Sequence, residues 1–365
     1  MKNNLLVVFG SGASFASGYR HKKLNLPPPI DQNFFSKMSQ NVFDGFPAIK
    51  MIRNANRFQE LRSLEENFSL GDCAYKIEIH HPKDTKNRMI GFVKKLKFYG
   101  IDEYRNYFRD LNQQYVNAGL RHKDIKMSDS REHLFTGDLG REFRILISEI
   151  YKSSNYNCEE DNYQRLLELI NGYLIGCVNF NYDLFAEKAL ARVSRDTKIL
   201  KYFHGCLRWK HSKGEPVSES TGGEEIEPNY KDTEKWIQPG IVAPAYVKEQ
   251  LEKPIPGDKM HKRLKHEHEE IKCYLPKIKR VLFIGYSFPD SDNYARDFWT
   301  KNVFVKKIKV GICNKPFDES EIPSKKKEYQ KKLSLSTEPE VYPCGFNKLV
   351  NPGAGNTFLE NFLEK

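Results

Sequence analysis

An amide and a carboxylate stand two residues apart in the segment VNFNYDLFAE, residues 178–187. At the end of a β-strand, the spacing of Asn181 and Asp183 can turn both side chains into one cleft. There the two groups can bind ribose hydroxyls or hold a water molecule. The same residues also fit a structural interpretation, in which Asn181 makes a turn and Asp183 caps a helix beginning at Leu184. The pair alone leaves both interpretations open.

A candidate general base follows in the segment KYFHGCLRW, residues 201–209. His204 comes after two aromatic residues and directly before Gly205. Because an imidazole titrates near neutral pH, His204 can take a proton from a hydroxyl or from a water molecule. A lone buried histidine is more often structural, and nothing in the sequence marks the nearby Cys206 as a nucleophile. His204 is therefore a candidate base that needs support from other residues.

A glycine-rich loop follows the apolar run of residues 5–9. Gly10 and Gly12 carry no Cβ, so the backbone there can approach a phosphate closely. A helix beginning near Ala13 would present N–H groups that favour the phosphate charge. Ser14 can cap that helix or bind the phosphate itself. The alternative is a plain turn between a strand and a helix, which the same residues fit.

Two later loops also place small or polar residues after apolar runs. Gly285 and Ser287 follow residues 281–284, and Asp292 stands near the start of a predicted helix. Asn314 follows the apolar segment VGIC. In open α/β sheets, ligands bind beyond the carboxyl ends of the strands, so these residues suit a nucleotide-facing position. The alternative for both loops is an ordinary strand-to-helix turn.

Short apolar runs must position these loops. They cover residues 5–9, 174–178, 281–284 and 303–310. Each run ends at a small or polar residue and a loop, which is typical of buried parallel strands. The sequence therefore predicts an α/β fold with a Rossmann-like parallel sheet.

The segment between the first two runs has another character. Residues 21–170 show helical periodicity with few strand signals, and residues 75–79 are the one strand candidate. We therefore expect a Rossmann-like domain made of residues 1–20 and 171–365, with a large, mostly helical insertion domain over residues 21–170. Single helices are predicted over residues 163–170, within 247–280 and at 324–332.

The bulk composition narrows the function classes. The 365-residue chain has a net charge of +11, so contact with nucleic acid stays an alternative, although lysine-rich helices give the same balance. None of its 7 cysteines forms a C-x-x-C pair, and the odd count favours reduced thiols in the cytoplasm. No apolar run approaches the roughly 20 residues that span a bilayer. We expect no bound metal and no membrane contact.

The opening loop is similar to that of a known family. Gly10-Ser11-Gly12-Ala13-Ser14, with Ser17-Gly18 after it, resembles the Gly-Ala-Gly-x-Ser…Ser-Gly segment of the sirtuin-like NAD-binding family. The resemblance implies that residues 10–14 hold the diphosphate of NAD. It also accounts for the absent third glycine of the usual dinucleotide fingerprint.

The later segments match the same family in the same order along the chain. Asn181 and Asp183 match its Asn-x-Asp pair, and His204 matches its catalytic histidine. The resemblance therefore implies catalytic roles for these three residues. The remaining matched residues, which the resemblance places around NAD, are Gly285, Ser287, Asp292 and Asn314.

The form of these segments is that of bacterial members of the family. FNYD, HGCLRW and GYSFPDSD resemble segments of prokaryotic sirtuin-like proteins that hydrolyse NAD during phage defence. The resemblance implies an NAD glycohydrolase that produces nicotinamide and ADP-ribose. It also implies a homo-oligomer that is restrained in healthy cells, with a HerA-type ATPase as a partner of some members.

Two family segments that are missing from this sequence help to choose between the alternative functions. Deacylase sirtuins carry four zinc-binding cysteines after the histidine, whereas Cys206 and Cys273 alone occupy that stretch here. The family's Pro-Asp-Phe-Arg segment is also missing after Gly18. Lysine deacylation is therefore the least favoured alternative. A nucleic-acid-binding or nucleolytic subunit stays open because of the basic charge, although no paired-carboxylate metal site supports nuclease chemistry.

Overall fold

The computed structural model describes most of the chain outside the predicted insertion. The described residues are 4–30, 147–193, 195–212, 215–220, 224–226, 237–242, 259–288, 292–304 and 307–364. Most of the predicted insertion, including the strand candidate at residues 75–79, lies outside them. The helical insertion therefore stays a prediction.

Parallel strands form the central sheet. They are β1 Leu5–Phe9, β4 Leu174–Asn179, β5 Leu200–Tyr202, β9 Arg280–Ile284, β10 Lys309–Cys313 and β11 Glu340–Tyr342. Their order across the sheet is β11-β10-β9-β1-β4-β5, and each neighbouring pair is parallel. Renumbered in chain order within the sheet, they run 3-2-1-4-5-6 from the β5 edge, which is the strand order of the Rossmann fold. The predicted α/β class with a Rossmann-like parallel sheet is confirmed.

Within the described residues, every predicted strand has a counterpart, and one of them is shifted along the chain. β1 has the predicted bounds, and β4 and β9 each extend theirs by one residue. The strand predicted over residues 303–310 exists but is shifted: β10 begins at Lys309, whereas Thr300–Phe304 form a π-helical turn. Val303 and Phe304 are apolar because they pack in the core beside the sheet. A short apolar run does not reveal whether it packs as a strand or as a helical turn.

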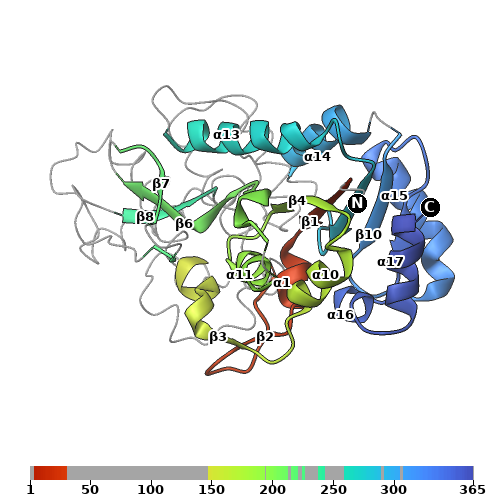
Figure 1. Cartoon of the computed structure of the whole chain (residues 1–365), viewed down its shortest axis with the longest axis horizontal. Coiled ribbons are helices and arrows are strands. Elements are labelled where there is room, and N and C mark those ends of the chain that lie inside the picture. Colours follow the sequence, from red (N-terminus) through yellow and green to blue (C-terminus); the bar gives the residue numbers. More distant parts are fainter. Residues whose placement is uncertain are drawn as a thin grey trace, which may run out of the picture.

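Helices cover both faces of the sheet. Leu5, Val7 and Phe9 of β1 join one hydrophobic cluster, and Leu6 and Val8 join the other. On the first face lie α10 Asn162–Ile170, α11 Phe185–Arg192 and α17 Ala354–Glu364, and on the second α13 Lys259–Tyr274, α14 Asn293–Trp299 and α15 Ile322–Leu333. Figure 1 shows α13 and α14 on one side of the sheet and α10 on the other. α13 and α15 are the helices predicted within residues 247–280 and at 324–332.

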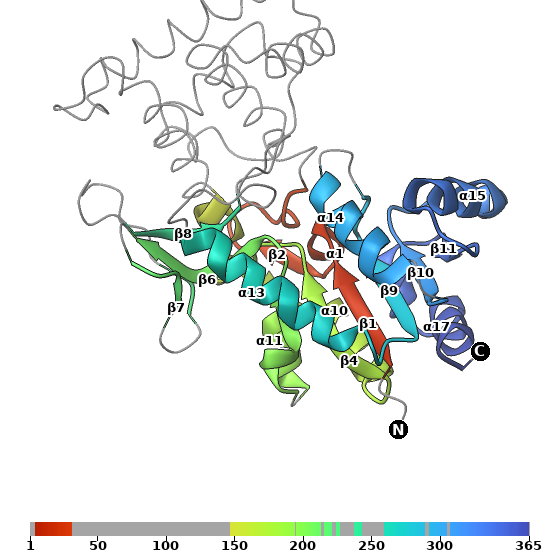
Figure 2. The ribbon, with the colours of Figure 1, turned by 90° about the horizontal axis from the view of Figure 1, so that it is seen from above.

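Smaller elements complete the described fold. β2 Tyr19–His21 pairs with β3 Tyr156–Cys158, and β6 Gly205–Ser212 lies between β7 Ser218–Glu219 and β8 Ile237–Ile241 (Figure 2). The short helices are α1 Ser11–Phe15 and α16 Phe346–Leu349. In the part of the chain that the structure describes, no helix has both the length and the apolar character that a bilayer crossing needs.

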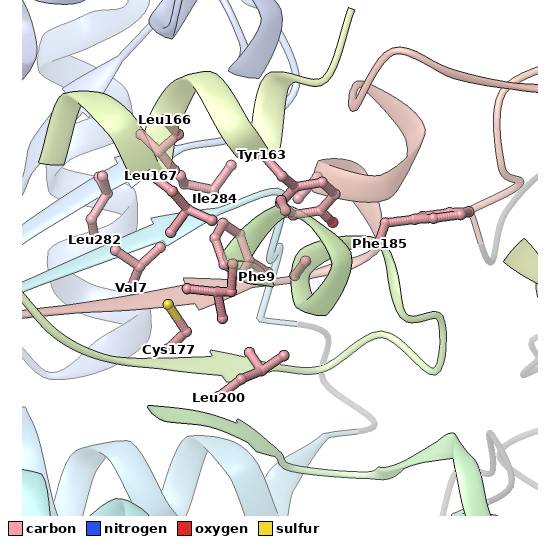
Figure 3. Close-up of a cluster of buried hydrophobic side chains, with 14 of the residues drawn as sticks. Val7, Phe9, Tyr163, Leu166, Leu167, Cys177, Phe185, Leu200, Leu282 and Ile284 are labelled. Carbon is pink, nitrogen blue, oxygen red and sulfur yellow. The ribbon is translucent and has the colours of Figure 1, made fainter. Parts of the chain in front are cut away.

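The end of the predicted insertion packs on the sheet. Tyr163, Leu166 and Leu167 of α10 lie over Val7 and Phe9 of β1 (Figure 3). The ring centroids of Tyr163 and Phe9 are 4.9 Å apart in an edge-on arrangement. The helix was predicted correctly, but it belongs to the helical layer of the sheet, so the sheet domain resumes before residue 171. An amphipathic pattern shows that a helix buries one face without showing which partner covers it.

Candidate functional site

The candidate site residues follow the carboxyl ends of neighbouring strands. β1 leads into Gly10, β4 into Asn181, β5 into His204, β9 into Gly285 and β10 into Asn314. Because the strands are parallel, their carboxyl ends lie side by side along one side of the sheet. We call this side the edge of the site; it is not one of the outer strands β5 and β11. The strand order reverses between β1 and β9, and a crevice beside such a reversal is where open α/β sheets bind ligands.

Buried polar side chains at this edge form a hydrogen-bond network of Ser14, Tyr163, Asn181 and Asp183, called here the Ser14 network. Ser14 Oγ donates to Asp183 Oδ2 at 2.7 Å and lies 3.0 Å from Tyr163 OH. Asn181 Nδ2 donates to Ser14 Oγ at 2.8 Å and to Gly10 O at 3.0 Å. The network therefore joins the loop after β1, helix α10 and the loop after β4.

The contacts of Asp183 fit both interpretations of the sequence, as a residue at the start of a helix and as part of a polar site. Its Oδ1 accepts from the N–H of Phe185, the first residue of α11, at 3.2 Å, while its Oδ2 joins the Ser14 network. Burial raises the pKa of Asp183 from 3.8 to about 6, and the hydrogen bonds from Ser14 and Phe185 oppose that rise. The N–H of Asn181 donates to Asn179 Oδ1 at 3.0 Å, as a turn requires. A carboxyl group that titrates near neutral pH can hold or release a proton at this edge.

His204 lies in a second group of polar side chains, which we call the His204 cluster: His204, Tyr286 and Asp292. His204 Nε2 is 3.3 Å from Asp292 Oδ1, and both side chains are buried. Asp292 Oδ2 accepts from Tyr286 OH at 2.7 Å. Phe180, next to Asn181 in the chain, packs edge-on against the imidazole with 5.1 Å between ring centroids. Phe180 thus packs against the His204 cluster and is next in sequence to Asn181 of the Ser14 network.

Close packing of two loops explains the glycines after β1 and β9. An added Cβ on Gly10 would lie 2.5 Å from Gly285 O, and one on Gly12 would lie 2.9 Å from Gly285 Cα. The N–H of Gly12 donates to Gly285 O at 3.0 Å, and the N–H of Ala13 donates to Gly10 O at 2.8 Å. Loop packing therefore uses both N–H groups, whereas the side chain of Ser11 is exposed. The phosphate-binding role of residues 10–14 stays a prediction.

The remaining predicted residues lie further along the same edge. Ser287 is exposed, and its carbonyl accepts from Lys332 Nζ at 3.3 Å. Asn314 Nδ2 donates to Tyr286 O and to Tyr329 OH, both at 2.9 Å. The other amide atom, Asn314 Oδ1, is buried and has no hydrogen-bond partner among the described residues. Such an acceptor fits a hydrogen-bond donor of a ligand.

Thiol and metal chemistry find no support at this edge. Cys206 is buried, and burial raises the pKa of its thiol well above the usual range, which disfavours a nucleophilic thiolate. Over the residues that the structure describes, no group of His, Cys, Asp and Glu side chains is arranged to hold a metal ion.

Sequence reasoning missed Tyr163. This fully buried tyrosine lies on the apolar face of α10, and its hydroxyl is 3.0 Å from Ser14 Oγ and accepts from Asn181 Nδ2 at 3.3 Å. The sequence indicated only that Tyr163 lies on a buried helix face, where a tyrosine hydroxyl needs a hydrogen-bond partner. The sequence did not show that this partner lay in the candidate site.

We expect Tyr163→Phe to lower the free energy of unfolding by about 1 kcal/mol, because the substitution removes a buried hydroxyl that two polar side chains contact. Urea denaturation measures the change. Tyr173→Phe is the matched control, since the Tyr173 side chain is only partly buried and lies outside the Ser14 network. Equal losses in the two variants would contradict the importance of the Tyr163 hydroxyl.

Comparison with known proteins gives a faint fold-level likeness. No protein-family model and no curated protein matches the sequence. Among solved structures, a Sir2 homologue in complex with ADP-ribose has a TM-score of 0.38 and 10% identity, covering 68% of this chain and 88% of its own. A Sir2 homologue in complex with NAD has a TM-score of 0.39 and 12% identity, and the match covers 68% of this chain and 86% of that one. Sir2Tm bound to a propionylated peptide has a TM-score of 0.31 and 12% identity, and the match covers 52% of this chain and 67% of that one.

Proposed function

We propose that this protein is an NAD glycohydrolase that cleaves the nicotinamide–ribose bond with water. The observation that supports the proposal is that Asn181, Asp183 and His204 follow the carboxyl ends of two neighbouring strands, β4 and β5, of a Rossmann-type sheet. These residues match the functional residues of the sirtuin-like family by sequence, and they come from loops after two different strands. The products would be nicotinamide and ADP-ribose.

NAD as the substrate fits the donors and acceptors at this edge. The buried Asn314 Oδ1 suits the amino group of adenine, in agreement with the adenosine-side role that the resemblance gives this residue. The diphosphate would lie beside residues 10–14, with Gly285 and Ser287 in the adjoining loop. The reacting ribose would then lie toward Asn181 and His204.

The proposed roles follow from the charge that develops during the reaction. Breaking the bond between the ribose C1′ and the nicotinamide nitrogen gives an oxocarbenium-like transition state and neutral nicotinamide. Asn181 has its Nδ2 fixed by Gly10 O and Ser14 Oγ, so the direction of its Oδ1 is set for a water molecule or a ribose hydroxyl. His204 takes the proton that water loses as its oxygen bonds to C1′. Asp183 supplies negative charge near the developing cation.

We also propose a finer biological role on the basis of the resemblance to bacterial members. The protein would act in the cytoplasm as an effector of antiphage defence, because NAD consumption stops the growth of an infected cell. Such an enzyme must be restrained before infection. Assembly into a homo-oligomer, or contact with a HerA-type ATPase, would provide that control.

The decisive experiment follows nicotinamide release from NAD by the purified protein, alone and with candidate activators. We expect His204→Ala and Asn181→Ala each to reduce the rate roughly 100-fold or more, the scale of a lost proton-transfer or orienting group. His266→Ala is the matched control, because His266 is an exposed histidine on α13.

Other outcomes would favour the alternatives. Nicotinamide release that requires an acylated lysine peptide would indicate a deacylase. Persistence of NAD under every activating condition, together with cleavage of DNA, would indicate a nucleolytic subunit. In that case DNA binding should weaken steeply as the salt concentration rises.

A further inference from the structure

Asp292 faces protein groups with both of its carboxylate oxygens. It precedes α14 and is 1% exposed. Oδ1 lies 3.3 Å from His204 Nε2, and Oδ2 accepts a hydrogen bond from Tyr286 OH at 2.7 Å. The resemblance places this residue among the NAD ligands, but the geometry directs its carboxylate to the histidine.

Because both side chains are buried, the contact between Asp292 and His204 affects the charge of each group. An ionised carboxylate away from water is costly unless it is hydrogen-bonded or paired with a cation. The Tyr286 hydroxyl supplies the hydrogen bond, and a protonated His204 would supply the cation. The 3.3 Å contact is at ion-pair distance and is not an aligned Nε2–H···Oδ1 hydrogen bond. The electrostatic attraction of the carboxylate still favours the tautomer that carries its hydrogen on Nε2, which leaves Nδ1 as the basic nitrogen.

His268 contacts a backbone carbonyl just before His204 and a side-chain hydroxyl just after Asp292. Its Nε2 lies 3.1 Å from Phe203 O, directly before His204, and its Nδ1 lies 3.1 Å from the hydroxyl of Tyr294, two residues after Asp292. Burial lowers the pKa of His268 to about 4, and its backbone hydrogen bond opposes that fall, so this ring is neutral near pH 7. Asp292, which Tyr286 holds, and the neutral His268 are therefore titratable neighbours of His204.

We propose that Asp292 is a positioning residue for His204: its carboxylate, held by Tyr286, sets the orientation and tautomer of the imidazole that takes the proton. This role rests on the proposed function, in which His204 is the base. The arrangement is that of a histidine base oriented by a buried carboxylate, a geometry that recurs on unrelated folds. Tyr286 acts through Asp292, because its hydroxyl donates to the carboxylate.

Steady-state kinetics with NAD separate positioning from ligand binding. We expect Asp292→Asn to lower kcat roughly 10- to 100-fold and to leave KM within about 2-fold, since the lost group orients a base. Tyr286→Phe should change the same parameter in the same direction by a smaller factor. Asp297→Asn is the matched control, because Asp297 lies on the exposed side of α14 in a surface ion pair with Lys301. A raised KM with an unchanged kcat would show that Asp292 binds NAD and would overturn the proposal.

Nitrogen NMR of histidine-labelled protein tests the same idea without turnover. His204, assigned by its loss in His204→Gln, should be the Nε2–H tautomer in the parent chain. In Asp292→Asn it should become a tautomer mixture with a lower imidazole pKa. An unchanged tautomer and pKa would refute the positioning role. Failure of the parent chain to release nicotinamide would refute the proposed function alone, because the spectra still report whether Asp292 orients His204.

Discussion

Gly285→Ala should leave little folded protein. An added Cβ at this position would lie 2.0 Å from Ala13 N and 2.4 Å from Gly12 C, both backbone atoms. The residue also has a φ of +65°, a region that side chains with a Cβ rarely adopt. The opposing loop has little room to withdraw, since Gly10 N donates to Ile284 O and Gly12 N donates to Gly285 O. We expect a loss of about 4 kcal/mol or more, comparable with the total stability of many domains.

Circular dichroism and thermal unfolding measure this loss, with Gly172→Ala as the control. A Cβ added to Gly172 meets no atom within 4 Å, so that variant should stay within about 0.5 kcal/mol of the parent. The comparison also separates two explanations of the glycine-rich loops. If Gly285→Ala folds and melts like the parent but binds NAD weakly, the glycine serves the ligand rather than the contact between the loops.

The fold was predictable because its strands are marked locally. A buried parallel strand is a continuous apolar run, and residues 5–9, 174–178 and 281–284 have this pattern. The same runs place Gly10, Asn181 and Gly285 after strand ends, which was enough to predict a ligand edge. The residues at 303–310 show the limit, because a helical turn buries apolar side chains as well as a strand does.

The pairing inside the site was not predictable, because it depends on contacts between distant residues. Ser14 and Asp183 are 169 residues apart, and Ser14 and Tyr163 are 149 apart. No local pattern in either partner indicates the other. For the same reason, the resemblance gave Asp292 a place in the motif but not its contacts with His204 and Tyr286, since a motif gives chain order and not the direction of a side chain.

Asp183→Asn should make the protein more stable above pH 6 while lowering its activity. The pKa of Asp183 is raised from 3.8 to about 6, chiefly by burial. As pH rises from 4 to 6, the unfolded chain releases this proton while the folded protein keeps it, so the folded state loses stability relative to the unfolded state. Above about pH 7 both states are ionised and the loss is constant at about 3 kcal/mol. An asparagine does not ionise and avoids this loss.

The pH dependence distinguishes this effect from changes in packing. The asparagine can keep the hydrogen bond from the N–H of Phe185, and any loss in the Ser14 network is independent of pH to a first approximation. The difference in unfolding free energy between the variant and the parent should therefore change by about 2.5 kcal/mol from pH 4 to pH 8, as measured by urea denaturation at each pH. The control Asp318→Asn should show no such gain, since hydrogen bonds with Ser320 lower the pKa of the exposed Asp318 carboxyl and reverse the sign.

A flat difference between Asp183→Asn and the parent would mean that Asp183 does not titrate as its burial requires. The expected combination of higher stability and lower nicotinamide release would instead show what the buried carboxyl is for. A group that lowers stability at neutral pH and has a neutral isostere of the same shape is retained where its charge is used. Asp183 would then take part in the reaction through its charge, in addition to accepting the hydrogen bond from the first N–H of α11.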